Sequence, residues 1–570
     1  MPAFLAICKQ SLVAERIKEF LLKTQSWGKC ENIYNLVYSD LLNEVLNNWA
    51  NYLEPIYHSE GIVEILKYWD KRETVALLAK KYRNQSWKLA ELIKDASTFP
   101  IAPIKEGIRK IGIYYPRFSI GGVQRVISLL IPKYREMGYD VVFFYDEKNV
   151  KEGFSIAEDI ELICISQFSD PDIRIRELYS LLEEKKIDLF IHHATSQESL
   201  LFDMLAAKVQ GIPAVITLHE AFTAQIGRLG VGAARKHELY RIADLVLVLS
   251  KVQESYWKAL GVRSRFILNP MTCTYDPDYR PNLCSHTIIW VGRIADDKNC
   301  VDAIRILSRV KKAIPDVKLI IVGDAANNQK KAEIDGLVGY YGVHDNVERV
   351  GFTREVDQYY RKASVYLMTS QVESFSMTLA ESKFYGIPAV MFDIPYIDLA
   401  HPETGTITVP WNNNEKAAEE IIRLFSDKNY MEQKSKLARD CAKKLSMYDI
   451  KAAWASIFQV FEEGQKNSSK EDMNVRISIE SIFSQYALAC NRYNELIKEL
   501  GQVRKEKEKL DKKLRNQNNS VSWKVGRLIT YIPRKIRGGI RCFKQHGMRY
   551  TLDRIKYKID KRMRIINANK

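Results

Sequence analysis

The sequence lacks the features that mark secreted, disulfide-bonded and membrane-spanning proteins. Its nine cysteines are scattered and none forms a C-x-x-C pair, which argues against a disulfide framework or a zinc site and favours reduced thiols in the cytosol. The first twenty residues lack a basic lead-in and a small-residue cleavage site. No uninterrupted apolar run approaches the ~18 residues of a membrane span. We therefore expect a cytoplasmic chain with no secretory leader and no transmembrane helix.

The body of the chain also lacks net charge, although the whole carries a formal charge of +16. Residues 501–570 hold 22 Lys and Arg against 5 Asp and Glu, which leaves 64 against 65 in the first 500 residues. The basic character therefore belongs to a tail. That tail contains no recognisable nucleic-acid-binding module, so we predict no nucleic-acid partner.

A length of 570 residues predicts two or more domains. Residues 1–105 carry apolar residues at helical spacing and are predicted to form a helical accessory segment. From Ile111 onward, short β-branched runs alternate with amphipathic stretches, which is typical of a parallel sheet covered by helices on both faces. The alternation stops at a loop and restarts near Thr287. We therefore predict an α/β protein with two Rossmann-like domains facing a cleft, at residues 106–275 and 285–430.

The remainder of the chain is predicted to be largely helical. Residues 431–465 are expected to be closing helices, and 475–516 a coiled coil, because eleven of twelve seam positions in 475–514 are apolar or aromatic. A homodimer through this coil is the simplest prediction, and packing on the chain itself or on a partner protein is the alternative.

Residues 521–570 combine an apolar stripe with many Lys and Arg, which indicates a basic amphipathic tail on an anionic membrane surface. The alternative is a stripe packed on the protein with solvated charges.

Two candidate phosphate-binding loops follow predicted strands. Gly121 and Gly122 open a predicted helix, whose free backbone amides favour an anion, although a plain tight turn also fits. Arg293 and Lys298 follow the first strand of the second sheet, at a carboxyl end where such folds bind ligands. A guanidinium fork and a mobile ammonium suit a diphosphate that gains negative charge as it leaves. Two neighbouring aspartates leave a solvated loop as the alternative.

A third candidate, from Glu373 to Glu381, follows the predicted strand VYLMTS. We expect a helix to begin near Ser376, so that free amides in its first turn point into the cleft. The four residues concerned are Phe375, Ser376, Met377 and Thr378. Two carboxylates eight residues apart could then each accept hydrogen bonds from sugar hydroxyls. Thr378 and Glu381 also fit a capping box, which would make Glu381 structural.

In the order and spacing of these motifs, the chain resembles the family-4 retaining glycosyltransferases of the GT-B fold over about 350 residues. The Glu-x7-Glu pair is the most specific sign of that family. The resemblance implies that Glu373 contacts hydroxyls of the donor sugar and that Glu381 holds the ribose. It also implies that Arg293 and Lys298 bind the diphosphate, together with the amides of residues 375–378.

The resemblance further implies a histidine near the reacting sugar. His219, at the end of PAVITLHE, matches it, and His193 is a weaker second candidate; a packed core histidine is the alternative. Two departures from the family pattern concern acceptor and base contacts. Gln124 stands where the family often has an acid, and Ala325 and Ala326 stand where a Gly-Pro is usual.

The function implied by the resemblance is transfer of a hexosyl-type sugar from a nucleotide-sugar to a glycan or lipid-linked acceptor in cell-surface polysaccharide synthesis. The enzyme would be peripheral at the inner face of the cell membrane. The leaving diphosphate would assist the acceptor hydroxyl, so neither a metal nor a cofactor is expected. The alternatives are a non-catalytic transferase-like assembly protein and a nucleotide-sugar epimerase of the same fold. A metal-dependent transferase is suggested by the Asp-Pro-Asp triplets at 170–172 and 276–278, which turn-forming prolines also explain.

Overall fold

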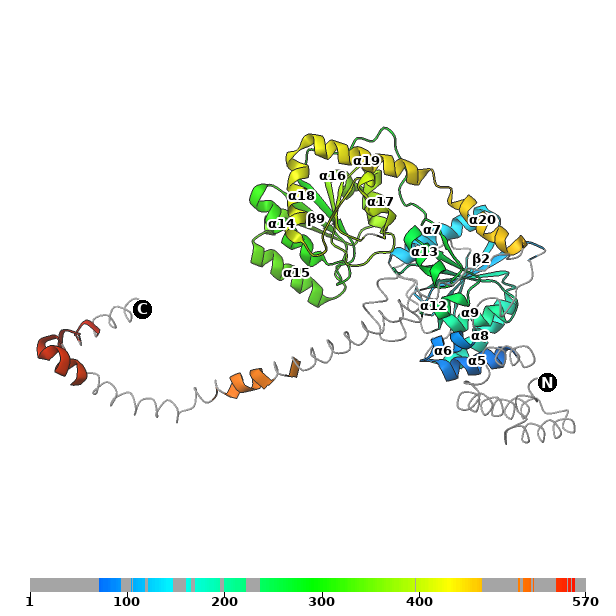
Figure 1. The fold of residues 1–570 in the computed structure, drawn as a ribbon, viewed down its shortest axis with the longest axis horizontal. Helices are drawn as coiled ribbons and strands as arrows, with labels where there is room; N and C mark the ends of the chain where they lie inside the picture. The colour runs from blue at the N-terminus through cyan, green and yellow to red at the C-terminus, as the bar shows by residue number, and fades with distance from the viewer. Residues whose placement is uncertain are drawn as a thin grey trace. The chain divides into compact units, whose positions relative to one another are not determined.

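The chain forms two units, Met1–Ala487 and Leu488–Lys570, and each is described by itself. The first unit contains two parallel sheets with their helices (Figure 1). The computed structural model describes residues 71–93, 104, 106–117, 121–146, 160–165, 170–194, 199–221, 236–394, 396–463, 501–502, 506–513, 516, 540–550, 552–554 and 556–558.

The first sheet has seven parallel strands in the order β3-β2-β1-β4-β5-β6-β7. The strands are β1 (Lys110–Tyr114), β2 (Asp140–Tyr145), β3 (Glu161–Cys164), β4 (Leu189–Ala194), β5 (Ala214–Leu218), β6 (Leu245–Val248) and β7 (Ser264–Phe266). The central strands are largely apolar, and almost all of their residues are buried, because helices cover both of their faces. The strand order reverses between β1 and β4, which is where folds of this type bind ligands at the carboxyl ends of their strands.

Five helices of the first domain supply this cover: α7 (Gly122–Glu136), α8 (Pro171–Glu184), α9 (Leu200–Lys208), α12 (Lys236–Arg241) and α13 (Lys251–Ala259). Alternate strand residues belong to different cores, as the pleat requires. Ile111 and Ile113 pack with α7, whereas Tyr114 and Phe190 pack with α8 and α9.

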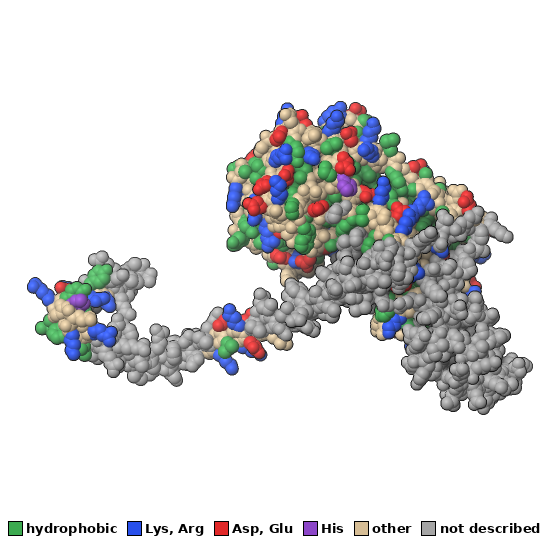
Figure 2. All heavy atoms as spheres, in the orientation of Figure 1, with side chains coloured by type: hydrophobic (Ala, Val, Ile, Leu, Met, Phe, Trp, Pro, Cys, Tyr) green, Lys and Arg blue, Asp and Glu red, His purple; other side chains and the backbone are tan. Residues whose placement is uncertain are grey.

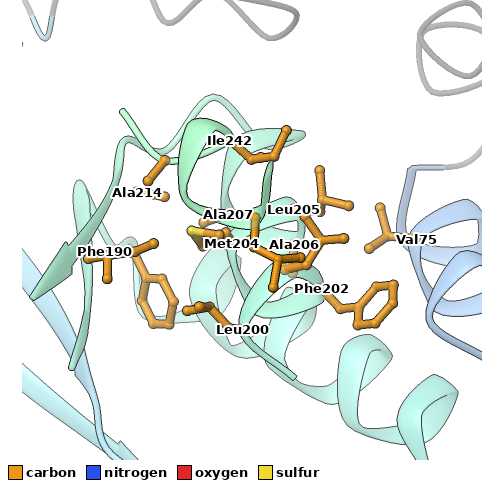
Figure 3. Close-up of a cluster of buried hydrophobic side chains, with 14 of the residues drawn as sticks. Val75, Phe190, Leu200, Phe202, Met204, Leu205, Ala206, Ala207, Ala214 and Ile242 are labelled. Atoms are coloured by element: carbon orange, nitrogen blue, oxygen red, sulfur yellow. The ribbon is translucent and has the colours of Figure 1, made fainter. Parts of the chain in front are cut away.

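Two helices from the predicted N-terminal segment complete the second of these cores. They are α5 (Lys71–Tyr82) and α6 (Ser86–Ile93). Figure 3 shows Val75 of α5 beside Phe202 and Leu205 of α9, and all three belong to one buried cluster. Glu73 of α5 also accepts two hydrogen bonds from Arg176 Nε of α8, at 3.0 and 2.9 Å. These two helices therefore form an outer layer on the first domain.

The second sheet has six parallel strands in the order β10-β9-β8-β11-β12-β13. They are β8 (Thr287–Val291), β9 (Lys318–Val322), β10 (Val347–Gly351), β11 (Val365–Met368), β12 (Ala389–Phe392) and β13 (Thr406–Val409). The helices are α14 (Cys300–Ala313), α15 (Asn328–Tyr341), α16 (Asp357–Lys362), α17 (Met377–Phe384), α18 (Asn414–Ser426) and α19 (Lys428–Ser446). Here the order reverses between β8 and β11. The predicted pair of Rossmann-like sheets is confirmed.

The last described helix of the first unit, α20 (Ile450–Glu463), returns to the first domain (Figure 1). Trp454 and Phe458 pack against Tyr134 of α7, with ring centroids 5.1 and 5.8 Å away. Arg265 of β7 donates to the Ser456 hydroxyl at 2.5 Å. Helix α20 therefore packs on the first Rossmann-like domain, against α7 and β7.

In the second unit, residues 506–513 and 540–550 are helical, and their side chains are largely exposed. The predicted coil at 475–516 and tail at 521–570 lie mostly outside the described residues, so both stay predictions. Among the residues that the structure describes, no helix is both long enough and apolar enough to cross a membrane.

Candidate active site

The candidate site lies at the carboxyl ends of β8 and β11, which are neighbours in the second sheet. The loop after each strand carries one of the predicted charged groups. The two loops are tied together by backbone contacts: the Gln371 amide donates to the Asp297 carbonyl at 2.9 Å, and the Thr369 hydroxyl donates to the Asn299 carbonyl at 2.8 Å. The Trp290 indole nitrogen in turn donates to Thr369 at 3.0 Å. A rigid frame therefore holds both loops.

Lys298 and Glu373 form an ion pair within this frame. Lys298 Nζ lies 2.6 Å from Glu373 Oε1, and the Ser370 hydroxyl donates to the same oxygen at 2.7 Å. Glu373 is 11% exposed and Lys298 is 29% exposed, so both side chains remain partly accessible to solvent. The sequence separates these two residues by 75 positions, and the strand order brings them together.

Helix α17 begins directly after Glu373. Ser376 is its N-cap, with a left-handed φ of 64°, and its hydroxyl accepts from the Leu379 amide at 3.3 Å. The capping box of Thr378 with Glu381 is therefore wrong; the Thr378 hydroxyl instead bonds that of Tyr366 at 2.7 Å. Within the described part of the chain, no acceptor lies within hydrogen-bond range of the backbone amides of residues 375–378. The helix thus offers an anion-binding N-terminus beside Lys298.

Glu381 is 4% exposed and is held by groups from three parts of the chain. It accepts from the Thr272 hydroxyl at 2.7 Å and from the Tyr360 hydroxyl at 3.0 Å, and Arg125 Nη1 of the first domain lies 3.3 Å away. These residues line a cavity of about 370 Å³, together with Tyr385 and others. None of the three partners was predicted, because no motif marks them.

His219 lies beyond the end of β5, and its backbone carbonyl accepts from the Ser374 hydroxyl at 2.6 Å. This contact places the predicted histidine next to the Glu373 loop. His219 Nε2 is 2.8 Å from Nδ1 of His193, which is fully buried. Burial lowers the pKa of His219 to about 4, so its ring is neutral at physiological pH.

Two predicted elements take less part in these contacts. Arg293 is 67% exposed and lies 3.7 Å from Asp297; the structure records no contact between it and Lys298 or Glu373. Gly121 is the N-cap of α7, in extended conformation. A Cβ on Gly121 would lie 2.3 Å from Gln124 Oε1, so this position excludes a side chain unless Gln124 moves. Within the described residues, no group of three or more His, Cys, Asp or Glu is arranged to hold a metal ion.

Comparisons with known proteins identify the family and the fold of this chain. A model described as Glycosyltransferase Family 4 matches residues 120–271, and one described as Glycosyl transferases group 1 matches residues 276–443. An uncharacterized glycosyltransferase of Haemophilus influenzae is 24% identical over 61% of this chain and all of its own length. The Bacillus subtilis poly(glycerol-phosphate) alpha-glucosyltransferase is 26% identical, over 41% of this chain and only 36% of its own length.

Solved structures show the same fold. Sucrose-phosphate synthase from Thermosynechococcus elongatus superposes with a TM-score of 0.52 at 16% identity, covering 62% of this chain and all of that one. Staphylococcus aureus TarM, in a complex with UDP, gives 0.52 at 12% identity over 62% of this chain and all of that one. The fold and the family models together define a glycosyltransferase of the GT-B architecture. Within that class the chain belongs to the family-4 type, since the two family models together match more than half of it.

Proposed function

We propose that this chain is a retaining glycosyltransferase that moves a hexosyl-type sugar from a nucleotide-sugar to a glycan or lipid-linked acceptor during cell-surface polysaccharide synthesis. Names of relatives support the pathway: the amylovoran biosynthesis glycosyltransferase AmsD of Erwinia amylovora is 24% identical over 48% of this chain and 77% of its own length. UDP in the TarM complex supports a nucleoside diphosphate as the leaving group.

The observation that carries the proposal is the Lys298–Glu373 pair beside the N-terminus of α17. A diphosphate has two kinds of partner here, the Lys298 ammonium and the four unpaired amides of residues 375–378. Both interactions strengthen as the leaving diphosphate gains negative charge, which is the requirement for lowering the barrier. The Glu373 carboxylate, held by Ser370, then accepts hydrogen bonds from donor-sugar hydroxyls.

Two further contacts change when a donor binds. Arg293 holds only a loose contact with Asp297, so its guanidinium is free to turn toward the diphosphate. Ribose hydroxyls donate hydrogen bonds to the Glu381 carboxylate, and they replace or share the contact that this carboxylate makes with Arg125. Retention follows if the leaving diphosphate assists the acceptor hydroxyl on the same face of the sugar. No residue needs to be a covalent nucleophile, and neither a metal nor a cofactor is part of the proposal.

A thermal-shift screen against common nucleotide-sugars tests the donor site. A donor at about a hundred times its Kd stabilises the folded protein by about 2.7 kcal/mol, which raises Tm by several degrees. Lys298→Met should abolish most of this shift. Lys312→Met is the matched control, since Lys312 is exposed on α14. Equal shifts in both variants would show that Lys298 does not bind the donor.

We also propose that the tail lies on an anionic membrane surface. Figure 2 shows basic and hydrophobic side chains together on the described part of residues 540–558. The exposed large apolar residues there are Ile540, Phe543, Met548, Tyr550, Leu552 and Tyr557, between 49% and 65% exposed. Each basic residue near an anionic leaflet contributes roughly 1 kcal/mol, and the apolar side chains insert at the headgroup level.

Flotation with liposomes of rising phosphatidylserine content tests this second proposal. A triple variant that changes Lys544, Arg549 and Arg554 to Glu should no longer bind the liposomes. The matched control changes Lys428, Lys436 and Lys444 to Glu, because these three are exposed on α19 and alter the total charge equally. Equal flotation of the two triple variants would refute a role for the tail.

A further inference from the structure

His193 and His219 form a pair at the carboxyl ends of two adjacent strands. His193 lies in β4, and His219 follows β5, its parallel neighbour. The rings are nearly parallel and meet edge to edge, with centroids 5.1 Å apart and an interplanar angle of 16°. The joined atoms are His193 Nδ1 and His219 Nε2, at 2.8 Å. This geometry is a hydrogen bond in which one ring must donate and the other must accept.

Both rings are neutral, so they share one hydrogen in this contact. Burial lowers the pKa of His193 well below its ordinary value, and the nearby His219 and His192 lower it further. Burial alone lowers the pKa of His219. A neutral imidazole carries hydrogen on one nitrogen only, and the direction of the bond therefore fixes the tautomer of both rings.

The second nitrogen of His193 decides the direction. Its Nε2 is buried and has no hydrogen-bond partner among the described residues. If His219 donated, His193 would carry its hydrogen on Nε2, and a buried N–H would be left without an acceptor. Buried N–H groups without partners are rarer than acceptors without partners. His193 therefore donates from Nδ1, His219 accepts at Nε2, and His219 keeps its own hydrogen on Nδ1.

We infer that His193 is a positioning residue that locks His219 in its Nδ1–H tautomer, so that His219 offers the reacting sugar a hydrogen-bond donor. The inference deepens the proposed function and rests on it for the identity of the sugar. The Ser374 contact anchors the His219 backbone next to the Glu373 loop, and His193 fixes the ring. With its Nε2 lone pair already occupied, His219 does not take a proton from the acceptor; it binds a sugar oxygen.

Activity measurements separate positioning from folding. His193→Phe keeps an aromatic ring but removes the N–H donor, so we expect kcat to fall by at least about tenfold, with KM for the donor changed less than about twofold. His193→Asn restores an N–H donor and should recover most of kcat. His286→Gln is the control, because His286 pairs with Asp316 at the amino end of β8, away from the site. Equal activity of the Phe and Asn variants, whether lost or retained, would overturn the inference.

A second measurement needs no substrate. Nitrogen-15 NMR of the full chain, labelled at its nine histidines, reports the tautomer directly, and His219→Gln identifies the His219 signals. At pH 7.5 we expect a protonated Nδ1 and an unprotonated Nε2 on His219, and loss of this preference in His193→Phe. A protonated Nε2 in the wild-type protein would refute the assignment. Because this result is independent of turnover, failure of the proposed function would leave it intact.

Discussion

Acidification should destabilise the first domain through the His193–His219 pair. Each ring has a lower pKa in the folded protein than in the unfolded chain, where histidine titrates near 6.5. The unfolded state therefore binds more protons at pH values below about 6.5. Stability contributed by the neutral pair is complete above that pH and is lost as the pH falls from about 6.5 toward 4.

The size of the loss follows from these pKa values. For His219, with a folded pKa of about 4, a change from pH 7.5 to 5.5 costs about 1.3 kcal/mol of unfolding free energy. The pKa of His193 is lowered in the same direction, so the pair together costs more than this amount.

The assay compares thermal midpoints at the two pH values for the wild-type chain and for the double variant His193→Asn, His219→Gln. A domain of this size shifts by about 2–4 °C per kcal/mol, so acidification should lower Tm by at least about 3 °C more in the wild type than in the variant. His286→Gln, an exposed histidine of the second domain, should behave like the wild type. The same Tm decrease in all three proteins would show that the pair is charged or solvated, and that our reasoning is wrong.

Further predictions concern the donor site and the coil. Glu373→Ala should lower turnover at least about 100-fold, the scale of one preorganised contact; near-normal turnover in a folded variant would remove it from the site. Arg293→Ala should lower turnover similarly with unchanged Tm, because its side chain is 67% exposed; a lower Tm instead would indicate a structural role. Glu381→Ala should weaken donor binding in calorimetry and cost stability by removing the shorter of the two hydrogen bonds that the buried Tyr360 hydroxyl donates; unchanged donor affinity would make Glu381 structural only. Residues 475–514 should dimerise the chain, and a monomer at micromolar concentration in sedimentation velocity would refute this.

Much of the fold was predictable because strand sequences report burial directly. Runs such as those of β5 and β12 are mostly apolar and are buried at every position, which occurs when helices cover both faces of a parallel sheet. The reversal of strand order then predicts where ligands bind. The Lys298–Glu373 contact follows from that topology, since β8 and β11 are neighbours.

The rest of the site depends on side-chain directions that periodicity does not encode. Arg125 meets Glu381 across 256 positions of sequence, and no motif connects them. The histidine contact requires two particular rotamers in adjacent strands. The capping box failed because Ser376 adopts a left-handed φ and caps the helix two residues earlier. Local pattern alone does not distinguish these alternatives.

The most direct test of the central claim is time-resolved proton NMR of the full chain with the nucleotide-sugar that stabilises it most. We predict release of the nucleoside diphosphate, dependent on Lys298 and Glu373, with the transferred sugar keeping the anomeric configuration of the donor. Conversion of the donor to an epimer without diphosphate release, or a product of inverted configuration, would contradict the account.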